Sequence, residues 1–129
     1  MPKLDLVILK EKFAICQLTP KDPIPDLTLL GDFWSITKTN EEISIIVPEK
    51  LVPLKCKTER GWRAIKIIGP LYFSLTGIIA SLSTVLAKAG ISIFALSTYN
   101  TDYILVKEKN LELSKQFLKE NGHNLIELH

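Results

Sequence analysis

The stretch that decides the fold runs from residue 61 to residue 128 and reads GWRAIKIIGPLYFSLTGIIASLSTVLAKAGISIFALSTYNTDYILVKEKNLELSKQFLKENGHNLIEL. Along this stretch the spacing of apolar residues alternates between a period of two, typical of a strand, and a period of about 3.6, typical of a helix. The pattern predicts strand 63–68, helix 77–89, strand 91–98, strand 103–107, helix 111–121 and strand 124–128. This βαββαβ order is typical of a split βαβ arrangement, in which an antiparallel sheet carries both helices on one face.

The first of these helices is the clearest local prediction. Ile78, Leu82 and Leu86 recur at the spacing that places side chains on one face of a helix. We expect the Thr76 hydroxyl to cap the start of this helix and Gly90 to end it in a left-handed conformation. Unpaired backbone N–H groups at a helix start also form a natural binding position for a small carboxylate.

The first half of the chain is richer in strand than in helix. Strands are expected at 4–9, 13–18, 33–37 and 43–47, with a charged turn at 10–12 between the first two. Three prolines between residues 20 and 25 leave room for a short helix at most, and residues 52–58 read as a linker.

An internal repeat links the two halves. The hairpin expected at 33–49 is similar to the hairpin expected at 93–108, and a glycine, Gly31 or Gly90, precedes each one. We therefore predict an α+β fold of two related lobes, 1–57 and 58–129, of which the first is poor in helix. The alternative is that two amphipathic hairpins resemble each other by chance.

Composition narrows the class of protein. The 129 residues are 47% hydrophobic and 23% charged, which is ordinary for a globular domain and argues against disorder. A net charge of +2 is too small to indicate nucleic acid or an anionic membrane as a partner. No apolar run approaches the roughly 18 residues that span a bilayer. We expect a soluble, cytoplasmic protein.

Chemistry-bearing residues are scarce. Cys16 lies in an apolar run and reads as a buried thiol, and its spacing from Cys56 fits no metal site. A disulfide between them would need a geometry that the sequence does not show. His123 and His129 have no Cys, Asp or Glu at the spacing of metal ligands, and no nucleophile motif is present. We expect no metal, no cofactor and no catalysis.

The second half resembles the ACT domain, a βαββαβ module that senses ligands in amino-acid biosynthesis. The resemblance rests on three strings: TGI at 76–78, LAKAGISI at 86–93 and STYNTDYILV at 97–106. The last string is similar to the stand-alone tandem-ACT proteins related to the cytosolic arginine sensors, the CASTOR-like family. The first lobe departs from this pattern because residues 20–26 replace most of its first helix, which leaves a ligand site of its own in doubt.

The resemblance implies an amino-acid site at an interface between ACT lobes. It would be formed by the loop into the first helix and the neighbouring strand ends, namely Leu75, Thr76, Gly77, Ile78, Ser97, Thr98, Tyr99 and Asp102. Gly77 has no Cβ, so a ligand carboxylate can approach the backbone there, and Asp102 can hold an ammonium or guanidinium group. The simpler alternatives are a helix cap at Thr76, a turn residue at Asp102 and a packing role for Tyr99.

Strand 91–98 is apolar on both faces, which we read as a sign of a homodimer. The alternative is an internal strand packed under a loop. A ligand-free dimerisation module is therefore the main rival to a small-molecule sensor. RNA binding, which other βαββαβ domains perform, lacks support because the candidate strands 63–68 and 103–107 carry one aromatic residue between them.

Overall fold

The computed structural model describes residues 3–53, 56–68 and 77–129. Contacts divide the chain into two compact units, and each is described here by itself. The split unit comprises Met1–Lys10 and Arg63–His129, and the inserted unit comprises Glu11–Trp62. The expected boundary between residues 57 and 58 therefore differs from this division: the first ten residues group with the second half of the chain, and residues 58–62 with the first.

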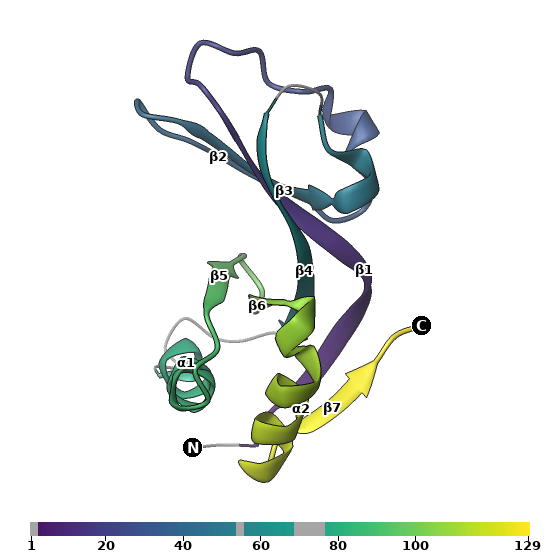
Figure 1. Cartoon of the computed structure of the whole chain (residues 1–129), viewed down its shortest axis with the longest axis vertical. Helices are drawn as coiled ribbons and strands as arrows, with labels where there is room; N and C mark the ends of the chain where they lie inside the picture. Colours follow the sequence, from purple (N-terminus) through teal and green to yellow (C-terminus); the bar gives the residue numbers. More distant parts are fainter. Residues whose placement is uncertain (1–2, 54–55, 69–76) are drawn as a thin grey trace. The chain divides into compact units, whose positions relative to one another are not determined.

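Two α-helices and seven strands account for most of the described residues (Figure 1). The strands are β1 (Asp5–Leu18), β2 (Ser35–Lys38), β3 (Ile43–Pro48), β4 (Lys57–Ile67), β5 (Ile93–Ser97), β6 (Asp102–Lys107) and β7 (Asn124–Glu127). The α-helices are α1 (Ile78–Lys88) and α2 (Leu111–Glu120), and short 3₁₀ turns occur at Leu27–Leu29, Glu49–Leu51 and Glu108–Asn110. From β4 onward the order is βαββαβ, which confirms the predicted α+β fold. Neither α-helix is long and apolar enough to cross a membrane.

Strand β1 corrects one prediction. The two strands expected at 4–9 and 13–18 form a single strand of 14 residues, and the expected charged turn lies in its middle. Lys10 and Lys12 are exposed and Glu11 is half-buried, so a strand can carry all three charges without burying them. The segment also lacks glycine, proline or asparagine, the residues that turn formation favours.

The sheet of the split unit has the strand order β7-β1-β4-β6-β5. The beginning of β1 lies between β7 and β4, and its Leu6 pairs with Leu125 in a parallel register. On the other side of β1, Ile68 N–H donates to the Asp5 carbonyl at 2.9 Å. Strands β5 and β6 are antiparallel, as predicted. Strand β1 additionally enters the sheet between β4 and β7 and pairs with β7 in parallel.

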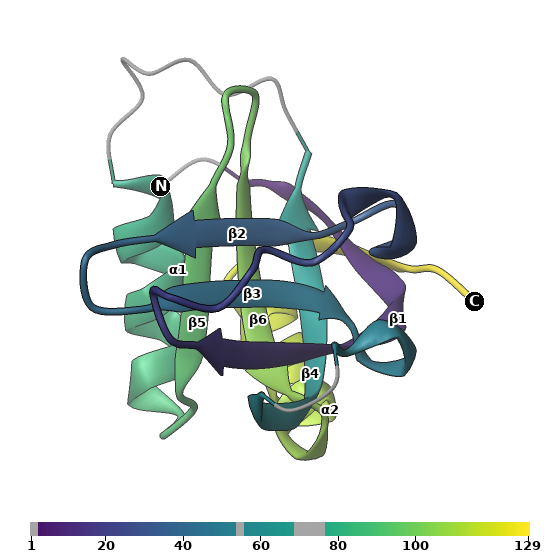
Figure 2. The same ribbon diagram turned by 90° about the horizontal axis from the view of Figure 1, so that it is seen from above.

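Both helices of the split unit cover the same face of its sheet. The buried residues of the core alternate along each strand and repeat along each helix: Leu6, Ile8, Ile65, Ile67, Ile104 and Val106 from strands, and Ile78, Leu82, Leu86, Leu111 and Leu118 from helices. Figure 2 shows α1 and α2 on one side of β4, β5 and β6. Helix α1 ends as predicted, because Gly90 has a φ of 75° and Ile91 N–H donates to the Leu86 carbonyl at 3.0 Å.

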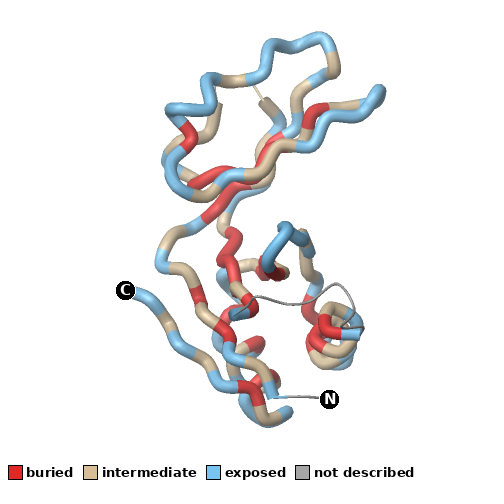
Figure 3. The backbone as a smooth tube through the Cα atoms, turned by 180° about the vertical axis from the view of Figure 1, so that it is seen from behind, coloured by how far each residue is buried: buried red, intermediate tan, exposed pale blue. Residues whose placement is uncertain are grey.

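The inserted unit is a small antiparallel arrangement around β3. Cys16 of β1 and Ile36 of β2 both pair with Ile45, from opposite sides of the strand. Its core includes Ala14, Ile43 and Val47, each at most 1% exposed. The loop after β1 is mostly exposed (Figure 3). The described part of this unit contains no α-helix, and its short 3₁₀ turn at Leu27–Leu29 follows Pro25, which agrees with the expectation that this lobe is poor in helix.

Candidate functional site

The far end of the β5–β6 hairpin concentrates polar groups that sequence analysis placed in the site. Ser97 and Asp102 face each other as the last pair of the antiparallel ladder. The Ser97 hydroxyl donates to the Asp102 carboxylate over 2.5 Å, a distance typical of a charge-assisted hydrogen bond. Asp102 is half-buried, so its carboxylate is oriented and still reaches solvent.

The turn between these strands is closed by two threonines. Thr98 donates its N–H and its hydroxyl to the Thr101 carbonyl, at 2.8 and 3.1 Å, and the Thr98 hydroxyl lies 3.3 Å from the Thr101 N–H. The Thr101 hydroxyl donates to the carbonyl of Ile67, the last residue of β4. Thr101 is only 5% exposed and was missed by sequence analysis, although a threonine pair three residues apart is a recognisable turn signal.

Tyr99 occupies the tip of the same turn. It is 83% exposed, the largest exposure among the exposed large hydrophobic side chains of the described residues. Sequence analysis placed it in the ligand site, with a packing role as the alternative. A single copy of the described chain buries little of its ring.

The start of α1 shows an open backbone. Gly77 occupies the cap position with a φ of 80°, and its carbonyl accepts from Ser81 N–H at 2.8 Å. Among the described residues, apart from its chain neighbours and the backbone of α1, no atom lies within 4 Å of the place where a Cβ at Gly77 would stand. The Ile78 side chain is buried in the core, which leaves its main chain to meet a ligand. Leu75 and Thr76, including the expected Thr76 cap, lie outside the described residues.

A groove follows the polar side of α1 and reaches the end of α2. It encloses about 380 Å³ and is lined by Gly77, Ala80, Ser81, Thr84, Val85, Lys88, Asn121 and His123.

His123 is 5% exposed, and its Nδ1 accepts a hydrogen bond from Leu4 N–H at 3.2 Å. Burial lowers the pKa of His123, which favours the neutral imidazole that this bond requires. His123 directly precedes β7 and Leu4 directly precedes β1, so this hydrogen bond links the starts of the two paired strands.

An ionic cluster of the split unit was not anticipated. Arg63 is 9% exposed, donates to the Leu9 carbonyl at 3.0 Å and lies 3.7 Å from the Glu127 carboxylate. Lys115 of α2 approaches Glu127 to 2.6 Å. That hydrogen bond lowers the pKa of Glu127 and raises the pKa of Lys115. Long separations in sequence hid this cluster, which connects β1, β4, β7 and α2.

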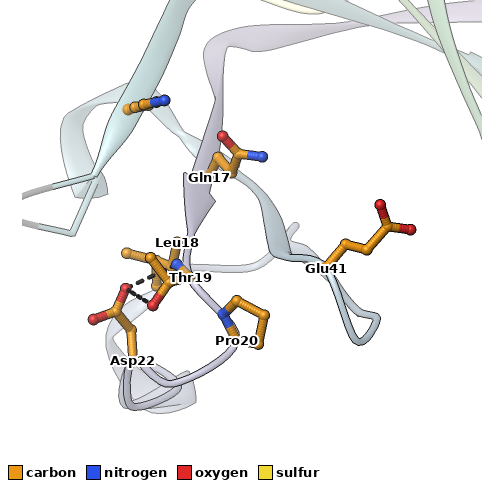
Figure 4. Close-up of a pocket in the computed structure, with 7 residues that line it drawn as sticks. Gln17, Leu18, Thr19, Pro20, Asp22 and Glu41 are labelled. Atoms are coloured by element: carbon orange, nitrogen blue, oxygen red, sulfur yellow. Dashed lines mark hydrogen bonds between the residues drawn. The ribbon is translucent and has the colours of Figure 1, made fainter.

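A second hollow, of about 370 Å³, lies in the inserted unit at the end of β1 (Figure 4). Asp22 accepts hydrogen bonds from the Thr19 N–H and hydroxyl at 2.8 and 2.9 Å, so its carboxylate closes the local turn. Glu41 lies apart from Asp22 in Figure 4. Among residues 3–53, 56–68 and 77–129, no group of three or more His, Cys, Asp or Glu side chains is arranged to hold a metal ion.

Comparison with known proteins gives two family matches. A model described as ACT domain matches residues 57–120, and a model of an N-terminal domain matches residues 11–55. The human protein CASTOR3P is 36% identical over 92 residues, which cover 61% of this chain and 56% of the human protein. The chain thus spans little more than half the length of that relative.

Among solved structures, one relative matches this chain along its whole length. Protein Atu0741 from Agobacterium tumefaciens is 35% identical, with a TM-score of 0.91, and the match covers 100% of this chain and 96% of that one. The regulatory subunit of aspartate kinase from Thermus thermophilus has a TM-score of 0.64 at 10% identity, covering 89% of this chain and 95% of that one. At that identity the likeness concerns the fold alone.

Proposed function

Since this chain belongs to the family of the Agobacterium tumefaciens protein Atu0741 and carries an ACT domain over residues 57–120, we propose that it is a non-enzymatic regulatory protein that binds a free amino acid. The observation that carries this proposal is the polar end of the β5–β6 hairpin. There, Ser97 holds the half-buried Asp102 carboxylate at 2.5 Å, beside a turn fixed by Thr98 and Thr101.

The chemistry of these groups matches the two ends of an amino acid. Asp102 offers a negative charge to an ammonium or guanidinium group, and the partial desolvation of its carboxylate strengthens such a pair. The open backbone at Gly77 and the N–H of Ile78 offer donors to a carboxylate at the positive end of α1. Leu75 and Thr76 complete the proposed loop, and Thr98 and Tyr99 flank the ligand.

The finer parts of the proposal concern assembly. We place the site at an interface with a second ACT domain, supplied by a partner copy in a cytoplasmic homodimer of tandem-ACT chains. The exposed Tyr99 ring would then gain a packing surface. Binding can regulate only if the ligand has different affinities for two states of the dimer or for its contacts with another protein.

Thermal unfolding against the twenty amino acids tests the proposal directly. A ligand at about 100 times its dissociation constant adds roughly 2.7 kcal/mol to the free energy of unfolding, which raises the midpoint measurably. We expect one amino acid to act and the others to have little effect. If none acts at millimolar concentration, the rival module that dimerises without a ligand is the better account.

Variants of Asp102 then test the site. We expect Asp102→Ala and Asp102→Asn each to weaken binding of the identified amino acid by at least about tenfold, because both remove the charge. Asp102→Asn keeps an oxygen that can accept from Ser97, so it separates loss of charge from loss of turn structure. Asp32→Ala, an exposed aspartate of the inserted unit, is the matched control. Unchanged affinity in both Asp102 variants would remove this residue from the site.

A further inference from the structure

The only two cysteines of the chain lie together in the inserted unit. Cys16 is on β1, Cys56 directly precedes β4, and both are free thiols. The core of the unit contains Cys16, and Cys56 packs against that core. The sequence left a disulfide open for want of geometry, and the structure provides the proximity.

A single hydroxyl group joins the two thiols. The Thr58 Oγ1 lies 3.4 Å from the Cys56 Sγ and 3.9 Å from the Cys16 Sγ. In the reduced protein the Cys56 thiol also donates to the Pro53 carbonyl at 3.1 Å. Both sulfur atoms therefore lie next to the Thr58 hydroxyl within an otherwise apolar cluster. Ordinary core packing does not require this arrangement.

We propose that Cys16 and Cys56 are a redox modification site, at which a low-molecular-weight disulfide oxidises the thiol pair to a reversible intramolecular disulfide. The inference is independent of amino-acid binding, because it concerns the inserted unit alone. Bond formation removes the thiol hydrogen of Cys56 and so ends its hydrogen bond to the Pro53 carbonyl. The hydrogen bond lost in this way is a weak one, because a thiol is a weak donor.

Burial sets the order of the two steps. Cys16 is 1% exposed, and burial, followed by the neighbouring Cys56, raises its pKa to about 11. A buried thiol that rarely ionises is a poor first nucleophile. Cys56 is only half-buried and directly precedes the first residue of β4, so its thiolate attacks the external disulfide first.

The reaction balances without a further oxidant. The Cys56 thiolate attacks one sulfur of the disulfide RSSR, which breaks the S–S bond, forms the mixed disulfide and releases RS⁻. Cys16 then loses its proton to solvent and attacks the Cys56 sulfur, which expels a second RS⁻. Two protein thiols are oxidised to one disulfide, and RSSR is reduced to two RSH after protonation. Dithiothreitol reverses both steps.

The test treats the folded, full-length chain with glutathione disulfide and follows its intact mass. We expect the protein to lose the mass of two hydrogens, to remain monomeric on a non-reducing gel, and to yield a linked peptide pair that contains both cysteines. The disulfide should raise the thermal midpoint by about 5 °C or more, since it closes a long loop. Dithiothreitol should reverse each change.

Two single variants assign the roles. Cys16→Ser should stop at a stable mixed disulfide that adds the mass of one glutathione less two hydrogens, at a rate close to that of the unmodified chain. Cys56→Ser should react at least about tenfold more slowly, because only the buried thiol remains. Circular dichroism confirms that each variant is folded. A lasting glutathione adduct on the unmodified chain, a disulfide between two chains, or no reaction of the folded protein would each overturn the proposal.

Discussion

Replacement of Leu6 by alanine tests the finding that the beginning of β1 shares a core with β4, β6, α1 and α2. Leu6 is 0% exposed and packs in the cluster that contains Leu82 of α1 and Ile67 of β4. Its strand is bonded on both sides, by β7 and by β4, so the backbone has little freedom to close a void.

The expected loss follows from this burial. Removing three buried carbons forfeits about 2.5 kcal/mol of transfer free energy at about 0.8 kcal/mol per carbon. An incompletely collapsed cavity adds about 1 kcal/mol. We therefore expect Leu6→Ala to lower the free energy of unfolding by about 3–4 kcal/mol. Leu113→Ala, the same change at a side chain 39% exposed on α2, should cost less than about 1.5 kcal/mol.

Urea unfolding followed by circular dichroism at 222 nm measures both variants. The α-helical signal comes from α1 and α2, which belong to the split unit, whereas Trp34 and Trp62 report on the inserted unit by fluorescence. We expect the helical transition of Leu6→Ala to move to lower urea with little change of slope. A loss no larger than that of Leu113→Ala would refute the placement of the first strand in this core.

Three further predictions concern single side chains. Because burial lowers the pKa of His123, the folded protein binds fewer protons there than the unfolded chain, so stability should fall as pH drops below about 6.5; urea titrations of His123→Asn should show a smaller fall. Thr101→Val removes the hydroxyl that donates to the Ile67 carbonyl and should cost about 1–3 kcal/mol by chemical unfolding, whereas Thr101→Ser should restore most of it. Gly77→Ala should cost about 1–2 kcal/mol by calorimetry, because alanine disfavours the left-handed backbone and no described residue beyond the chain neighbours obstructs a Cβ there; an equally large loss in Gly77→Asn would contradict this cause.

Local periodicity was enough to predict the elements of the second half. The stripe of Ile78, Leu82 and Leu86 gave α1 to within a residue at either end, since helix packing depends on spacing within one segment. The pairing of β1 with β7 could not be predicted this way. Leu6 and Leu125 are neighbours in the sheet but distant in sequence, and an apolar strand carries no information about which partner it pairs with.

The candidate site likewise contains contacts that the sequence predicts and contacts that it does not. Ser97 and Asp102 flank a short turn, so their meeting follows from the hairpin that the sequence predicted. The Thr101 bond to Ile67 and the Arg63 bond to the Leu9 carbonyl join segments far apart in the chain. Such contacts depend on the complete sheet. The threonine pair at 98 and 101 indicates a local turn, but neither that signal nor the residue type at position 63 predicts which distant carbonyl each side chain meets.

The insertion of β1 between β7 and β4 has a consequence for synthesis on the ribosome. All strands of the inserted unit are available once residue 62 has emerged, so that unit can fold early. The apolar residues Leu6 and Ile8 must wait until β7, more than a hundred residues later, is made. Until then the edge of β1 that β7 will cover exposes unpaired backbone groups, which other nascent chains can also bind. The most aggregation-prone interval in the life of this protein should therefore precede the release of residues 124–127.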